Sequence, residues 1–159
     1  MKITLLTVGK IKEKYWLQAI AEYSKRLGAY VKLEIVEVVD EKTPDQASQA
    51  FEEQIRKKEG ERLLAKCPAD AYVIALAILG KSLTSEQLAE KIESLGIYGT
   101  SHIVFVIGGS LGLSPEVLKR ADYQLSFSAM TFPHQMMRVI LLEQIYRCYR
   151  IINSEPYHK

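Results

Sequence analysis

The sequence predicts an α/β fold in which a mainly parallel sheet is covered by helices on both faces. Short apolar runs and amphipathic, capped segments alternate along the chain in the order β-α-β-α-β-α-β-α-β-α. Two of the apolar runs, 71–78 and 103–107, carry almost no polar residue, which is typical of central parallel strands buried on both sides. This alternation predicts a parallel sheet. Because no repeat or linker divides the chain, we expect a single domain over residues 1–159.

Two strands and two helices are predicted in the first part of the chain, over 3–8, 15–27, 33–39 and 44–66. Gly9 closes the first strand and Gly28 stops the first helix, whose apolar residues recur at helical spacing. The second helix is expected to begin with Thr43 as N-cap and Pro44 at the first helical position. Gly60 inside this helix predicts a kink or a break, and the mixed charges around it indicate a solvated face.

Three strands and three helices are predicted in the remainder, over 71–78, 85–95, 103–107, 114 onward, 125–127 and 133–152. Thr84 or Ser85 caps the first of these helices. Ser114 caps the second helix, with Pro115 at its first helical position, and Pro133 opens the last one. In sheets of this kind ligands sit at the carboxyl ends of the strands, so we expect the chemistry in the loops that follow the last three strands.

The bulk composition is that of an ordinary globular protein. Of the 159 residues, 48% are apolar and 25% are charged. The net charge of +2 is too small to predict a nucleic-acid partner, although it does not exclude a local basic patch. The opening apolar run is too short for a signal peptide and no run reaches the length of a membrane span, so we expect a cytoplasmic protein with no membrane segment. Cys67 and Cys148 are then expected to be free thiols.

The glycine-rich turn after the strand at 103–107 has the position of a nucleotide-binding loop but not its spacing. Gly108, Gly109 and Gly112 do not match the dinucleotide pattern G-x-G-x-x-G, and no lysine follows at the offset of a P-loop. No Arg or Lys lies between Gly108 and Glu116 to meet a triphosphate. A nucleotide-binding dehydrogenase or kinase is therefore disfavoured. Two interpretations stay open: a tight turn that needs glycine, or a backbone that approaches a flat, uncharged ligand closely.

Two further segments are candidates for binding or catalysis. Segment 126–138, SFSAMTFPHQMMR, crowds apolar side chains into a loop, where they need one another, a second subunit or a ligand as cover. The tail 155–159 carries a Tyr-His pair that can stack on a base or exchange protons, although termini are ordinarily disordered. The three histidines and two cysteines show no metal-ligand spacing, so no metal site is expected.

Several stretches of the chain together resemble the RlmH (YbeA) family, within the SPOUT class of methyltransferases. They are ITLLTVGKIKEKYW, AYVIALAILGK, VFVIGGSLGLS and LSFSAMTFPHQMMRVILLEQIYRCYRI with the terminal EPYHK. The resemblance covers the whole chain, and the combination of GGSLGLS, SFS-MTFPHQ and EPYHK is highly specific. It implies a homodimeric enzyme that uses S-adenosylmethionine to methylate N3 of a pseudouridine in 23S ribosomal RNA of the large subunit. It also implies an α/β-knot, a carboxyl-terminal trefoil knot that alternation alone does not predict.

Carried over position by position, the resemblance implies a cofactor site in the loops that follow the last three strands. The residues it assigns to S-adenosylmethionine are Leu76, Gly108, Phe127, Ser128, Ala129, Met130, Thr131 and Phe132. The residue types suit this cofactor, which has an adenine and a sulfonium but no phosphate. Adenine needs apolar walls and backbone hydrogen bonds, and a sulfonium is compatible with aromatic or carbonyl surroundings.

Four residues are candidates for the chemistry at the acceptor base. The N3–H of a uracil ring is weakly acidic, so its proton must leave before or during attack on the methyl group. His134 and His158 are the candidates that titrate, and Tyr157 can stack on the base. Arg138, one helical turn after His134, can hold a phosphate or a ring oxygen.

The remaining expectations concern partners. Lys10, Lys12 and Lys14 form a basic cluster near the end of a strand, and the residues leave open whether it meets RNA phosphates or only solvent. The broad apolar band of the last helix fits burial against a second subunit as well as core packing. Arg147 and Arg150 are expected to face the cofactor cleft or RNA. The alternative function is a non-catalytic protein that binds RNA or the ribosome, to which the low net charge gives little support.

Overall fold

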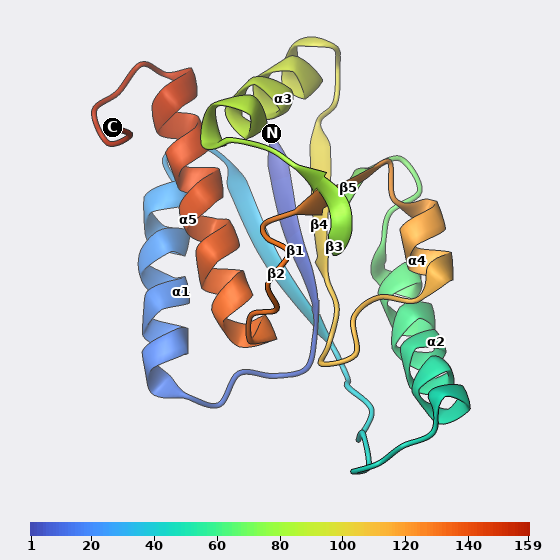
Figure 1. Cartoon of the computed structure of the whole chain (residues 1–159). Coiled ribbons are helices and arrows are strands. Elements are labelled where there is room, and N and C mark those ends of the chain that lie inside the picture. The colour runs from blue at the N-terminus through green and yellow to red at the C-terminus, as the bar shows by residue number, and fades with distance from the viewer.

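A computed structural model describes all 159 residues and contains a five-stranded sheet with helices on both faces (Figure 1). The elements are β1 (Lys2–Val8), α1 (Lys14–Leu27), β2 (Lys32–Val38), α2 (Gln49–Lys66), β3 (Tyr72–Ser82), α3 (Ser85–Ile97), β4 (His102–Ile107), α4 (Pro115–Arg120), β5 (Tyr123–Ser126) and α5 (His134–Ile152). The strand order is β2-β1-β4-β3-β5 and every neighbouring pair is parallel. The predicted α/β class and the parallel sheet are confirmed.

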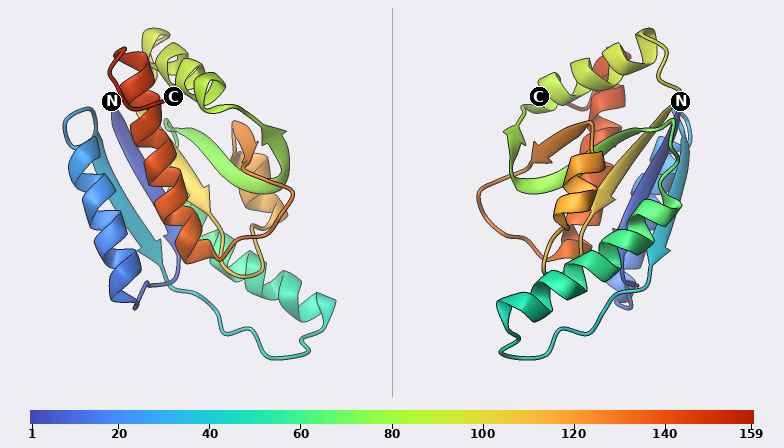
Figure 2. Two further views of the ribbon diagram at one scale, coloured as in Figure 1. Left: turned by 60° about the vertical axis from the view of Figure 1, so that its left-hand side comes forward. Right: turned by 90° about the vertical axis from the view of Figure 1, so that its right-hand side faces the viewer.

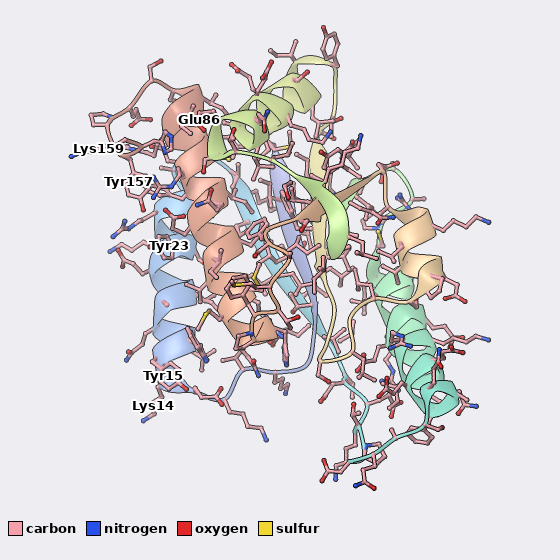
Figure 3. The ribbon with its side chains drawn as sticks, viewed as in Figure 1. Lys14, Tyr15, Tyr23, Glu86, Tyr157 and Lys159 are labelled. Carbon is pink, nitrogen blue, oxygen red and sulfur yellow. The ribbon has the colours of Figure 1, made fainter.

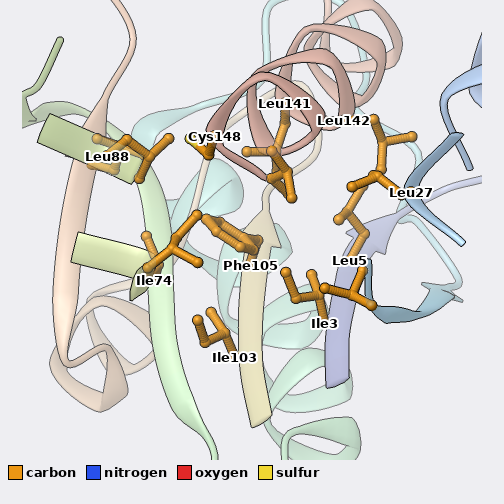
Figure 4. Packing of buried hydrophobic residues seen from close by; sticks show 14 of the residues in the cluster. Ile3, Leu5, Leu27, Ile74, Leu88, Ile103, Phe105, Leu141, Leu142 and Cys148 are labelled. Atoms are coloured by element: carbon orange, nitrogen blue, oxygen red, sulfur yellow. The ribbon is translucent and has the colours of Figure 1, made fainter. Parts of the chain in front are cut away.

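The sheet is buried on both faces because its strands alternate two sets of apolar side chains. In β1, Ile3 and Leu5 point into a cluster beneath α1, α3 and α5 (Figure 4), whereas Leu6 and Val8 point into a second cluster beneath α2 and α4. Figure 2 shows the two helical layers on opposite sides of the sheet. Each fully buried side chain of this kind contributes about 1.5–3 kcal/mol to folding. The near-continuous apolar runs of the sequence thus pack against helices on both faces of the sheet.

The parallel arrangement gathers all strand ends at one edge of the sheet. The strands run in one direction, and α5 begins at the edge where β1, β2 and β4 end (Figure 1). The turns after these strands, the loop after β5 and the first turn of α5 therefore lie close to one another. No helix is both long and apolar enough to cross a membrane. The predicted trefoil knot concerns how the chain threads and stays a prediction.

Several predicted boundaries are wrong, each for a local reason. The second helix begins at Gln49 instead of 44, because Gln46 has a left-handed backbone with φ 59° and the N-cap is Ser48, which accepts from the Phe51 N–H at 3.2 Å. Gly60 does not break this helix. Pro133 is the N-cap of α5 and not its first helical residue.

The third strand continues well beyond the predicted end at residue 78. After Leu76 pairs with Leu125, the register shifts, and pairing to β5 resumes at Lys81. The residues between them, 77–80, are not paired with β5. The two cysteines are free, as predicted.

Replacing Gly60 by alanine is expected to lower the free energy of unfolding by about 1–3 kcal/mol, even though alanine favours a helix by about 1 kcal/mol. A Cβ at Gly60 would clash with Oγ of Ser114, which accepts from the Val117 N–H at 3.3 Å and so caps α4. Urea unfolding measures the change. Gly96→Ala in α3 is the matched control, because a Cβ there meets only Cε of Met1 at 3.6 Å. A Gly60→Ala protein as stable as this control would contradict the packing described.

Candidate functional site

A cavity of about 620 Å³ opens at the carboxyl ends of β3, β4 and β5. Three segments of the chain wall it: Leu76–Ile78 after the regular part of β3, Ile107–Gly112 after β4, and the stretch from Leu125 to Met137. Its lining contains apolar side chains, glycine backbone, a few hydroxyls and one histidine, but no Lys, Arg, Asp or Glu. The cavity therefore suits a ligand with flat apolar parts and hydrogen-bonding edges, and it offers no countercharge to a phosphate group.

The glycine turn after β4 lines this cavity because it is folded tightly against itself. A Cβ at Gly108 would lie 2.7 Å from the carbonyl carbon of Gly112, which has a left-handed backbone with φ 82°. The Gly112 N–H donates to the Gly109 carbonyl at 3.1 Å. The tight-turn interpretation is therefore confirmed, and the bare backbone of the turn forms a wall of the cavity; its close approach to a ligand stays a prediction.

A buried carboxylate supports this turn from behind, where the sequence indicated a solvated helix face. Glu59 of α2 is only 4% exposed, and one of its oxygens accepts from the Glu41 N–H at 3.0 Å. A Cβ at Gly109 would lie 3.2 Å from its other oxygen, which has no partner. Burial raises the pKa of Glu59. The expectation of a solvated face was wrong here because charge pattern alone does not reveal which side of α2 packs under the loops.

The loop after β5 forms the opposite wall and is shaped by its own hydroxyl groups. Ser126 Oγ donates to the Ser128 carbonyl at 3.2 Å, and Ser128 Oγ accepts from the Met130 N–H at 3.0 Å. These bonds hold Phe127 toward the cavity while Met130 stays 73% exposed. Ala129 is exposed and does not line the cavity. The loop thus offers an apolar surface that the single chain leaves partly uncovered.

His134 and Arg138 lie on the first two turns of α5 but have different surroundings. His134 is half-buried, lines the cavity, and its Nδ1 has no hydrogen-bond partner. Burial, and after it the nearby Arg138 guanidinium, lower the pKa of His134. Arg138 is 2% exposed and donates to Glu37 at 2.6 Å and to the carbonyls of Val8 and Gly9 at 2.9 and 2.8 Å. Its guanidinium is used inside the protein and is not available to a phosphate or a base.

The carboxyl-terminal tail is ordered but lies away from the cavity of its own chain. Tyr157 OH donates to the Glu143 carboxylate at 3.0 Å, and its ring stacks on the Arg147 guanidinium. The ring nitrogens of His158 contact Glu86 at 2.6 Å and Arg147 at 3.2 Å. Figure 3 shows Tyr157 and Glu86 near the end of α5, far from its first turn. Neither tail residue lines the cavity.

Two arginines expected at the cleft instead hold this tail in place. Arg147 pairs with Glu143, and Arg150 pairs with Glu155 and donates to the Pro156 carbonyl at 2.7 Å. Neither arginine faces the cofactor cleft of its own chain, because helical spacing places them about three to four turns beyond Met137, which is the last residue of α5 at the cavity. The expectation that they face RNA stays a prediction.

The structure brings together most of the residues predicted for the cofactor. They are Leu76, Gly108, Phe127, Ser128, Met130, Thr131 and Phe132, joined by His134. Sequence reasoning missed the Ala77–Ile78 bulge, Leu111 and Met137, which also line the cavity. Leu111 lies in the glycine-rich turn and Met137 in segment 126–138, both of which the sequence analysis named as candidates. Their place in these segments is the signal from which they could have been predicted. No group of three or more His, Cys, Asp or Glu side chains is placed to hold a metal ion.

The lowered pKa of His134 predicts a loss of stability in mild acid. Because the unfolded chain binds the proton more readily than the folded one, the free energy of unfolding should fall as the pH drops through about 6.5. A His134→Asn protein should lose part of this slope. Urea unfolding between about pH 7.5 and pH 5.5 measures it, and identical slopes in the two proteins would contradict the assigned surroundings of His134.

Comparison with known proteins is consistent with this site. The family described as "Predicted SPOUT methyltransferase" matches residues 1–158. A protein of Bifidobacterium adolescentis named ribosomal RNA large subunit methyltransferase H is 71% identical over 159 residues, all of both chains, and one of Exiguobacterium sibiricum with the same name is 62% identical over the same span. A probable methylase family protein of Haemophilus influenzae Rd KW20 shares the fold, with a TM-score of 0.53 and 16% identity over 99% of this chain and 70% of that one.

The family model matches nearly the whole chain, and the relatives are highly identical over their whole length. The chain belongs to the RlmH family of SPOUT methyltransferases.

Proposed function

We propose that this protein transfers a methyl group from S-adenosylmethionine to N3 of a pseudouridine in 23S ribosomal RNA, as a cytoplasmic homodimer. The observation that carries the proposal is the cavity of about 620 Å³, whose lining is apolar and contains no charged side chain. Adenine fits between apolar walls and glycine backbone, and a sulfonium is compatible with aromatic and carbonyl groups. The names of the relatives, which describe methylation of large-subunit ribosomal RNA, support the substrate class.

The residues of the cavity fit the donor at the positions inherited from the family. The backbone of Gly108 would meet the adenosine, and the side chains of Leu76 and Phe127 would cover its apolar surface. Bound there, the cofactor supplies an electrophilic methyl group on sulfur. The protein would exclude water from the apolar walls and hold the acceptor in line with that methyl group, and such positioning can lower the barrier of a two-substrate reaction substantially.

Of the two titrating candidates, we propose His134 as the group that handles the acceptor proton, because it lines the cavity of its own chain and His158 does not. Its lowered pKa keeps the imidazole neutral near pH 7, so that a ring nitrogen can accept the proton from N3–H. Arg138, in contrast, would not contact the substrate. Its hydrogen bonds to the end of β1 hold the start of α5, and with it His134, against the sheet.

The tail residues would act across a subunit interface. Tyr157 and His158 of one chain lie at the far end of α5 from that chain's own cavity. We propose that a second subunit brings its tail to the cavity, because the chain's own tail would have to leave all of these contacts to reach it. Exposed Tyr15 and Leu17 on α1, beside α5, supply apolar surface for such a contact.

The direct test incubates the protein with labelled S-adenosylmethionine and with ribosomes that lack this methyl group. We expect label at N3 of one pseudouridine of 23S RNA. A Gly108→Ala protein should lose transfer, and calorimetry should show at least about tenfold weaker binding of S-adenosylhomocysteine, because the added Cβ displaces Gly112. Gly96→Ala serves as the matched control. Ribosome binding without any transfer would favour the non-catalytic alternative, and binding of NAD or ATP instead would favour a different enzyme.

Mixing two inactive proteins tests the shared site. Removal of residues 155–159 should abolish transfer while leaving S-adenosylhomocysteine binding measurable. When this truncated chain and the Gly108→Ala chain are refolded together, a mixed dimer has one intact cavity facing one intact tail, so about a quarter of the normal rate should return. No recovery in the mixture, with mixed dimers verified by mass, would show that the tail does not act across the interface.

A further inference from the structure

A second hollow adjoins the cofactor cavity and has a different character. It has a volume of about 410 Å³, lies at the carboxyl ends of β1 and β2, and we call it the β1–β2 hollow. Its lining residues are Gly9, Lys10, Lys12, Glu37, Val38, Val39, Asp40, His134 and Gln135. His134 belongs to both spaces, so the imidazole forms part of the boundary between them. A molecule in the β1–β2 hollow would therefore lie directly beside whatever occupies the cofactor cavity.

The free charges of the β1–β2 hollow are mainly positive. Lys10 and Lys12 are exposed and take part in no ion pair. Of the two carboxylates, Glu37 is neutralised by Arg138 at 2.6 Å, which leaves Asp40 as the only unpaired acid. Lys14 follows at the start of α1 on the same edge (Figure 3). The lysines thus exceed the available acidic groups, in contrast to the uncharged cavity next to it.

The start of α5 adds to this positive character. Pro133 gives no side-chain cap, and the first turn of the helix contains no acidic residue. The first helical bond runs from the Met137 N–H to the Pro133 carbonyl, so the N–H groups of the three residues between them have no helical acceptor. His134 and Gln135, two of these residues, line the β1–β2 hollow. Unused N–H groups and the positive end of a helix dipole favour an anion beside the lysines.

We propose that the β1–β2 hollow binds a backbone phosphate of the RNA substrate, next to the nucleotide that is methylated. This inference rests on the proposed function and gives its substrate a place on the protein. A nucleic-acid strand consists of bases joined by phosphates, so a phosphate held on Lys10 and Lys12 leaves the adjoining base free to reach past His134 toward the methyl donor. The two spaces then have separate roles: the uncharged cavity binds the methyl donor, and the β1–β2 hollow binds the acceptor strand. Lys10 and Lys12 are positioning residues in this arrangement.

The test measures equilibrium binding of large ribosomal subunits that lack the methyl group, as a function of salt, in the presence of S-adenosylhomocysteine. For a Lys10→Gln/Lys12→Gln protein, we expect the slope of log Kd against log salt to fall by about one, because the phosphate held by the two lysines together is no longer neutralised. The dissociation constant should rise roughly tenfold near 0.1 M salt. A Lys10→Arg/Lys12→Arg protein should retain the slope and most of the affinity, because the charges are kept.

The matched control is Lys25→Gln/Lys66→Gln, which removes the same charge from the last turns of α1 and α2, at the opposite edge of the sheet. This protein should keep the normal slope. An unchanged slope in the Lys10→Gln/Lys12→Gln protein, or an equal fall in the control, would overturn the proposal. Calorimetry with S-adenosylhomocysteine should give the same affinity for all three variants. Because binding is measured without transfer, the result does not depend on whether methyl transfer itself is found.

Discussion

The geometry of both spaces depends on one buried cation, Arg138. Its guanidinium reaches across from α5 to the Glu37 carboxylate on β2 and to the carbonyls of Val8 and Gly9 at the end of β1. A buried charge is costly unless it is paired and hydrogen-bonded, and removing one partner of such a pair costs about 3–5 kcal/mol. Because three acceptors converge on it, Arg138 fixes the first turns of α5 against the carboxyl edge of the sheet. His134, one turn earlier, is thereby held between the cofactor cavity and the β1–β2 hollow.

On the two sides of His134 lie two spaces with different electrostatic character, the cofactor cavity and the β1–β2 hollow. The cofactor cavity is walled by the glycine turn and the loop after β5, and its lining carries no charged side chain. The β1–β2 hollow has Lys10 and Lys12 at its mouth and an uncapped helix start beside it. The proposed sulfonium cofactor and the proposed polyanionic acceptor have opposite electrostatic requirements, and two adjoining spaces of different charge would meet both. The family relationship, the neutral His134 and the distant tail are all consistent with this division.

Much of the fold follows from local patterns in the sequence. The apolar runs of β1, β3 and β4 predict buried parallel strands because each has side chains to place on both faces. Ser114 and Pro115 predict the start of α4 because capping is a local interaction, and the structure has Ser114 bonded to the Val117 N–H. The start of α2 could not be predicted in this way. Thr43 and Pro44 look like a helix start, but the left-handed Gln46 separates them from the helix, and that conformation is set by the surrounding loop.

The site was only partly predictable, and the reason is again tertiary. Family resemblance places Gly108 and Phe127 correctly at the cavity, because their roles belong to the loops themselves. Arg138 was expected to meet substrate because it shares a helical face with His134, but its acceptors come from the ends of β1 and β2, about a hundred residues or more earlier in the chain. The burial of Glu59 likewise depends on the loops that pack over it. The spacing of residues in the sequence cannot predict contacts between residues so far apart in the chain.

The most direct test of the central claim is a crystal structure of the protein with S-adenosylhomocysteine bound. The account predicts the ligand in the cavity at the ends of β3, β4 and β5, with its adenosine against the Gly108 backbone and Phe127 and with no contact to a lysine or arginine of the same chain. Ligand density in the β1–β2 hollow, or elsewhere on the surface with this cavity empty, would contradict it.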